Sequence, residues 1–183
     1  MNMKPIDTSM IRLWEKYHLP EKKRVHVTLV AHVCEFIGMK VNEISKKTVV
    51  DLQLLSMAAL LHDIDNGVEF LPGEHHPDAA VRILRSEHME TVAEIVKTHS
   101  LTSVLNKEIV PKKWEEKILY VADKMVKYEI ITVDKRFALW RNESLPLSAI
   151  RSLDQCYPIV KNLELEVFSF IHEDPNSLAR ILA

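Results

Sequence analysis

Histidine and aspartate are the residues of this sequence whose positions could support chemistry. The 183-residue chain contains nine histidines, and histidine is both the commonest protein ligand of metal ions and the side chain that titrates nearest neutral pH. His26 precedes apolar residues by three, four and seven positions, and His99 follows apolar residues at the same spacings. Residues so spaced share one face of a helix, so we expect both imidazoles on buried faces.

Two aspartates stand in equally apolar surroundings. Asp123 lies within an apolar helical pattern, and His62 and Asp63 close the most apolar helix of the chain. A buried carboxylate is costly unless it is paired or binds a metal. Taken alone, each residue is explained as an ordinary core group, and Lys124 or Arg24 could pair with Asp123. Four helices that each direct a His or Asp inward favour a shared metal centre.

Composition excludes several other functions. The three glycines have neither the G-x-G-x-x-G spacing of a dinucleotide site nor the G-x-x-x-x-G-K spacing of a P-loop. Lys and Arg total 24 against 26 Asp and Glu, for a formal net charge of −2. The chain therefore has no overall basic field of the kind that drives binding to nucleic acids or membrane surfaces.

The sequence favours a cytoplasmic protein. Cys34 and Cys156 lie in amphipathic helical patterns and are expected to be buried free thiols in a reducing compartment. Residues 1–10 lack the apolar segment of a signal peptide. The most apolar stretch, 49–61, is too short and too interrupted by polar residues to span a membrane.

Helical periodicity covers almost the whole chain and predicts an all-α domain, a bundle of about six to eight helices around one core. The expected helices cover 7–18, 20–38 with Gly38 as its C-cap, 47–62, 77–84, 89–99, one long helix from 111–114 to 141, 148–172, and a weak one from 177. The segment 100–113 is expected to be a loop near the site. A helix end before Asn66–Gly67 would let His62 and Asp63 face the same site.

The order H…HD…H…H…D from His26 to Asp123 resembles the HD superfamily of metal-dependent phosphohydrolases. The local contexts RVHVTLVA, AALLHDID, HHPDAAVRIL, VKTHS and YVADK are similar to the motifs of that family. The pattern is of the HDIG type and looks most like the bacterial diadenosine tetraphosphatase group. It aligns His76 with the third histidine of the family and leaves His75 as a competing imidazole. Asp65 departs from the pattern, because the family often has glycine there.

The resemblance implies a single HD-type domain over 1–183, with a metal-site core at 20–141 and a C-terminal helical extension at 142–183. It implies divalent transition metal ions, two of them, among which Fe, Mn, Co, Ni and Zn are not distinguished. Asp63 would bridge the two ions. The implied metal ligands are His26, His62, Asp63 and Asp123 for the first ion and His76 and His99 for the second.

The implied activity is cleavage of a phosphoester or phosphoanhydride bond in a small nucleotide-type substrate by a metal-activated hydroxide. Asp63 would be the catalytic residue. Arg82, Lys97 and Lys124 are candidate phosphate contacts, although a solvated helix face would explain each of them. A nucleotide phosphomonoesterase, a cyclic-nucleotide phosphodiesterase, a non-catalytic metal- or nucleotide-binding sensor module and a metal-free helical interaction domain are the alternatives. A homodimer is left open.

Overall fold

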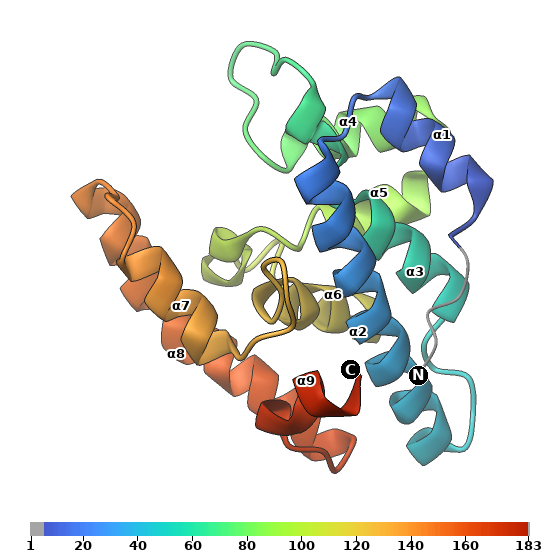
Figure 1. The fold of residues 1–183 in the computed structure, drawn as a ribbon, viewed down its shortest axis with the longest axis vertical. Coiled ribbons are helices and arrows are strands. Elements are labelled where there is room, and N and C mark those ends of the chain that lie inside the picture. Colours follow the sequence, from blue (N-terminus) through green and yellow to red (C-terminus); the bar gives the residue numbers. More distant parts are fainter. Residues whose placement is uncertain (1–5, 183) are drawn as a thin grey trace.

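The computed structural model describes residues 6–182, and within that range it is built from helices and loops, with nine α-helices and three short 3-10 helices (Figure 1). The α-helices are α1 (Thr8–Lys16), α2 (Glu21–Ser45), α3 (Leu52–Leu61), α4 (Asp78–Ser86), α5 (Glu90–Val96), α6 (Trp114–Lys124), α7 (Val133–Arg141), α8 (Leu147–Phe170) and α9 (Leu178–Ile181). The 3-10 helices are η1 (Ile64–Gly67), η2 (Leu101–Leu105) and η3 (Pro175–Ser177). The predicted all-α class is confirmed.

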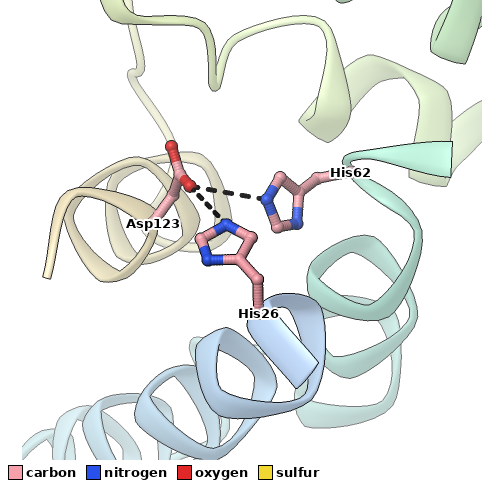
Figure 2. A group of neighbouring side chains, drawn as sticks. All are labelled: His26, His62 and Asp123. Atoms are coloured by element: carbon pink, nitrogen blue, oxygen red, sulfur yellow. Dashed lines mark hydrogen bonds and ion pairs between the residues drawn. The ribbon is translucent and has the colours of Figure 1, made fainter. Parts of the chain in front are cut away.

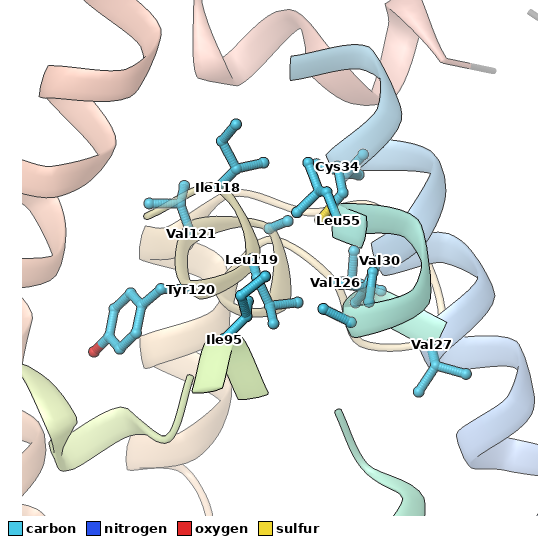
Figure 3. Packing of buried hydrophobic residues seen from close by; sticks show 14 of the residues in the cluster. Val27, Val30, Cys34, Leu55, Ile95, Ile118, Leu119, Tyr120, Val121 and Val126 are labelled. Carbon is cyan, nitrogen blue, oxygen red and sulfur yellow. The ribbon is translucent and has the colours of Figure 1, made fainter. Parts of the chain in front are cut away.

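The core forms where α2, α3, α5 and α6 meet. Helix α2 packs along α3 and α6, while α5 lies against α3, α4 and α6. Figure 3 shows apolar side chains of these four helices in mutual contact at the centre of the bundle. Helices α7 and α8 run side by side along one flank, and α8 also contacts α6 (Figure 1). His26 and Asp123 lie on two of these four helices, and His62, Asp63 and His99 follow the other two.

The prediction that Gly38 caps a helix is wrong, because α2 continues to Ser45 and ends at Lys46 in the left-handed conformation, with φ 52°. Gly38 serves packing instead. A Cβ there would lie 2.8 Å from Leu52 Cδ2 and 3.2 Å from Leu55 Cδ2. A glycine that admits a neighbouring helix and one that ends a helix look alike in sequence.

The prediction of one long helix up to residue 141 is also wrong. Helix α6 ends at Lys124, where the N–H of Met125 bonds back to the Ala122 carbonyl 3.0 Å away. Helix α7 starts after Thr132, whose hydroxyl accepts a hydrogen bond from the Lys135 N–H at 3.1 Å. The chain turns between the two helices, and α7 therefore approaches the site from another direction.

The remaining expected helices are present with shifted ends. The largest shift is in α3, which begins five residues late because the Asp51 carboxylate caps it by accepting a hydrogen bond from the Leu54 N–H at 2.9 Å. Helix α3 stops at Leu61, which confirms the expected helix end beside His62. The turn that follows packs closely against the residues after α1, because a Cβ on Gly67 would lie 2.3 Å from the carbonyl oxygens of Tyr17 and His18.

Cys34 and Cys156 are both buried and unpaired, as expected. Within residues 6–182, no helix has the length and apolar character needed to cross a membrane. The expectation about residues 1–10 falls partly on residues 1–5, which lie outside the described residues. The boundaries of the proposed core and C-terminal extension stay predictions.

Candidate metal centre

The six predicted ligands converge at one place in the bundle. Five of them line a cavity of about 240 Å³, and His62 lies fully buried just behind it. They come from separate elements. His26 lies on α2, His62 and Asp63 follow α3, His76 precedes α4, His99 follows α5 and Asp123 lies on α6. Ser100 and Leu101 also line the cavity, so the segment 100–113 does reach the site as expected, although its part Leu101–Leu105 forms the 3-10 helix η2 and not a loop.

The first group of donor atoms surrounds Asp123 (Figure 2). Its Oδ1 lies 3.0 Å from His26 Nε2 and 3.5 Å from His62 Nε2. Asp63 Oδ2 lies 3.8 Å from each of the same two nitrogens. Atoms that bind one divalent ion at about 2.0–2.2 Å are roughly 3 to 3.6 Å apart. These four side chains are spaced so that modest adjustments would let them share an ion.

The second group adjoins the first through Asp63. His76 Nε2 lies 2.9 Å from His99 Nε2 and 3.7 Å from Asp63 Oδ1. The two oxygens of Asp63 thus face different histidines, Oδ2 towards the first group and Oδ1 towards the second. A carboxylate that bridges two ions needs this arrangement.

Each of the four histidines is oriented by a hydrogen bond at Nδ1. Three rings face a backbone carbonyl, which can only accept, so their Nδ1 must donate. The acceptors are Lys127 O for His26 (3.2 Å), Ala59 O for His62 (2.8 Å) and Val96 O for His99 (2.5 Å). For His76, the partner of Nδ1 is the carboxylate of Asp65. In a neutral ring held this way, the lone pair is on Nε2, the atom that faces the other ligands.

Asp65 is an outer partner of the site. Its side chain is fully buried, and both of its oxygens lie 3.0 Å from His76 Nδ1. The departure seen in the sequence thus puts a carboxylate behind a candidate ligand. The structure places His76 in the cavity, and His75 is not among the residues that line it.

Nearby positive charges lower the pKa values of Asp63 and Asp123 and so favour the ionised carboxylates that bind metal ions. Burial would raise the pKa of Asp123, but the positive charge of the neighbouring Lys124 ammonium opposes it, and that pKa lies well below its usual range. Burial opposes ionisation of Asp63 as well, yet the charges of His62 and Lys23 lower its pKa. Both side chains are therefore ionised near neutral pH.

The buried imidazoles differ in protonation. Burial would lower the pKa of His62, but the carboxylates of Asp63 and Asp123 raise it, so this ring must lose a proton before it can bind an ion. Burial lowers the pKa of His99 well below its usual value, and the nearby His76 and His62 reinforce the effect, so His99 is neutral and can act as a ligand. His62 Nε2 is buried and, although Asp123 Oδ1 lies 3.5 Å away, it makes no hydrogen bond to any residue of 6–182. A buried polar atom without a partner costs about 1–3 kcal/mol, and a bound ion would supply the missing partner. The residues present fit a divalent transition metal.

The three predicted phosphate contacts occupy different surroundings. Arg82 pairs with Glu74 through contacts of 2.5 and 3.0 Å, and Lys97 is exposed. Neither lines the cavity. Lys124 does, but its ammonium lies 2.8 Å from Asp123 Oδ2 and donates to the His99 carbonyl. A role in substrate binding stays a prediction for all three.

Sequence reasoning missed two cationic side chains of the cavity. Lys23 Nζ lies 2.7 Å from Asp63 Oδ2. Its position three residues before His26 puts it on the same helix face, and this spacing could have revealed it. Arg136 also lines the cavity. The expected continuous helix concealed it, because only the turn after Lys124 brings α7 to the site.

Comparison with known proteins gives one match. A family model described as HD domain matches residues 25–127, more than half of the chain and the interval that contains all six candidate ligands. No curated protein and no solved structure shows a significant match.

Proposed function

Because the chain belongs to the HD domain family, we propose that it is a metal-dependent phosphohydrolase acting on a small nucleotide-type substrate. The observation that carries the proposal is the placement of Asp63, whose two oxygens face two separate sets of histidine Nε2 atoms. This arrangement suits a pair of divalent ions bridged by one carboxylate.

The proposed ligand sets follow the two groups of donor atoms. His26, His62 and Asp123 would hold one ion, His76 and His99 the other, and Asp63 would contact both. When bound, the ions supply a water activated for attack near neutral pH and positive charge that offsets the phosphoryl oxygens. The histidines are already oriented for this task by their Nδ1 hydrogen bonds, so little rearrangement is needed on binding.

The shape and lining of the cavity support a small phosphorylated substrate. Its volume of about 240 Å³ suits a phosphate group and its immediate surroundings better than a macromolecule. Lys23 and Arg136 add positive charge to the wall, and Phe70 and Trp140 add aromatic surface. Cationic groups favour a phosphate, and aromatic surface favours a nucleobase.

The test is a hydrolysis panel with Mn²⁺, Fe²⁺, Co²⁺ and Ni²⁺, run on protein of measured metal content. The substrates are a nucleoside monophosphate, a cyclic nucleotide and a dinucleoside tetraphosphate, which separate monoesterase, diesterase and phosphoanhydride cleavage. Hydrolysis of at least one substrate is expected. A metal content well below one equivalent in protein purified without chelator would refute the proposal, and bound metal without any hydrolysis would favour the sensor module.

Matched variants assign the activity to the site. Asp63→Ala and His99→Ala should abolish hydrolysis, whereas retained activity in either would contradict the assignment. His76→Ala and His75→Ala form a closer pair, since the two imidazoles are adjacent in sequence but only His76 lines the cavity. We expect the first substitution to impair hydrolysis and metal binding and the second to leave both unchanged.

A further inference from the structure

One cationic side chain of the cavity lacks an acidic partner. Of the three cations in the lining, Lys23 pairs with Asp63 and Lys124 pairs with Asp123. Arg136 forms no ion pair with a carboxylate of residues 6–182. Its Nε is buried and has no hydrogen-bond partner within that range. A buried guanidinium N–H without a partner is energetically unfavourable, and a cation beside a cavity with no carboxylate partner is suited to receive an anion.

Trp140 holds the guanidinium in place. The two residues are four positions apart on α7, so they share a helix face. The guanidinium carbon of Arg136 lies 4.6 Å from the centroid of the Trp140 ring, and both side chains line the cavity. Packing against the ring limits the orientations of the guanidinium and leaves the N–H groups at its edge available.

Arg141, on the same helix, shows what a structural arginine looks like in this protein. Its guanidinium also packs on an aromatic ring, that of Tyr157 at 5.1 Å, but it donates a hydrogen bond to Asp154 at 3.1 Å. Arg141 therefore has a carboxylate partner within the protein. Arg136 has the aromatic partner without the carboxylate, and it faces the cavity.

We propose that Arg136, positioned by Trp140, binds a phosphate group of the substrate. The planar fork of a guanidinium matches two oxygens of one phosphate, which a lysine ammonium cannot do. This inference rests on the proposed function, because it assigns the substrate phosphate to that same cavity. It adds a phosphate contact outside the matched family region, since Arg136 lies beyond residue 127.

The experiment measures binding and turnover separately. Inorganic pyrophosphate is titrated calorimetrically into metal-loaded wild type, Arg136→Gln, Arg136→Lys and Arg141→Gln. KM and kcat are then measured with the best substrate of the panel. We expect Arg136→Gln to weaken pyrophosphate binding and to raise KM about tenfold or more, with a smaller effect on kcat. Arg136→Lys should restore part of the binding, and Arg141→Gln should behave as wild type.

Trp140 is tested as a positioning residue. Trp140→Leu should weaken pyrophosphate binding several-fold, and Trp140→Phe should recover it because an aromatic ring is restored. Metal content and the melting temperature are measured for every variant, so that loss of the ions or of the fold is recognised. For Trp140→Leu we expect unchanged metal content and a KM between that of wild type and that of Arg136→Gln.

Two outcomes overturn the inference. One is a wild type that does not bind pyrophosphate, and the other is a folded, metal-loaded Arg136→Gln variant with wild-type affinity and KM. Failure of the proposed function gives a different result. A protein that hydrolyses nothing in the panel but binds pyrophosphate through Arg136 would refute the proposed reaction and support the phosphate site.

Discussion

Asp65 holds the imidazole of His76 through both of its carboxylate oxygens, each 3.0 Å from Nδ1. The carboxylate is fully buried, so the contact with His76 takes the place of hydrogen bonds that an exposed carboxylate would make to water. It leaves His76 Nε2 pointing towards His99. A carboxylate behind a ligating histidine fixes the tautomer and makes the ring a stronger ligand. The residue that departs from the expected glycine thus completes the arrangement around one candidate ligand.

Replacing Asp65 should therefore weaken metal binding without removing a ligand. For Asp65→Ala we expect a loss of about 10- to 100-fold in metal affinity, measured by competition with a chelator of known affinity. The Nδ1 proton of His76, followed by ¹⁵N NMR, should lose its strong hydrogen bond. Glu69→Gln, at an exposed acid four residues further on, is the control. Unchanged affinity in Asp65→Ala would show that His76 needs no such support.

The two carboxylates proposed as metal ligands should differ in their effect on metal content. Asp123 faces only the first group, whereas Asp63 faces both. Asp123→Asn should reduce binding of one ion, and Asp63→Asn should reduce binding of both, because a bridging ligand is lost to each. Elemental analysis after equilibration with excess metal and desalting distinguishes the two. Equal losses in both variants would argue against a bridging role.

Gly67 should tolerate no side chain. A Cβ there would lie 2.3 Å from the carbonyl oxygens of Tyr17 and His18, and backbone atoms cannot move aside as a side chain can. We expect Gly67→Ala to lower the free energy of unfolding by about 3 kcal/mol. Gly73→Ala is the matched control, since its φ of 84° brings strain but nothing lies within 4 Å. It should cost about 1 kcal/mol, and urea denaturation measures both.

The placement of several candidate ligands could be predicted because it depends on local periodicity. His26 and Asp123 lie on apolar helix faces, and a helix that buries such a face carries the polar residue inward with it. His99 lies beyond the end of α5, so the prediction that this helix includes it is wrong, although its imidazole is buried as expected. The helix end after Leu61 followed from the turn residues Asn66 and Gly67. For these positions, the sequence within one or two turns contains the information needed.

The partners of the ligands could not be predicted, because they depend on how distant segments pack. The contact between Lys23 and Asp63 joins α2 to the end of α3, and the approach of Arg136 depends on the turn between α6 and α7. Gly38 shows the same limit, since its role depends on α3 lying against it. Contacts between elements are decided by tertiary packing, which overrides local signals.

Glu164 should make stability depend on pH. It is buried on α8 with Lys161 as its partner, and Oε1 has no hydrogen bond within the described residues. Burial raises its pKa above the ordinary 4.5, despite the Lys161 ammonium. Because its pKa is higher in the folded state, the folded protein binds this proton more tightly than the unfolded chain does. Protonated Glu164 therefore favours folding below pH 4.5, and this stabilisation is lost as the pH rises from 4.5 through the raised pKa.

Glu164→Gln should therefore remove the decrease in stability that ionisation of Glu164 causes as the pH rises. We expect it to stabilise the protein by about 1 kcal/mol at pH 7 and to have no effect near pH 4, where the carboxyl is already neutral. Thermal unfolding at both pH values measures the difference. Glu166→Gln, two residues away and half exposed, is the control, because it removes a carboxylate from the same helix at a position that is not buried. Destabilisation of Glu164→Gln at pH 7 would mean that the Lys161 ion pair outweighs the burial.

Lys23 should matter most when no metal is bound. Its ammonium lies 2.7 Å from Asp63 Oδ2 and supplies positive charge where a cation would also act on that carboxylate. Lys23→Gln leaves the buried carboxylate with less compensation, so metal-free protein should lose about 1–2 kcal/mol of stability. Bound ions would provide that charge themselves, and the metal-loaded variant should lose much less. The rise in melting temperature on metal addition is therefore expected to be larger in Lys23→Gln than in wild type, with exposed Lys22→Gln as the control. An equal loss of stability with and without metal would show that the Lys23 contact with Asp63 is independent of the metal centre.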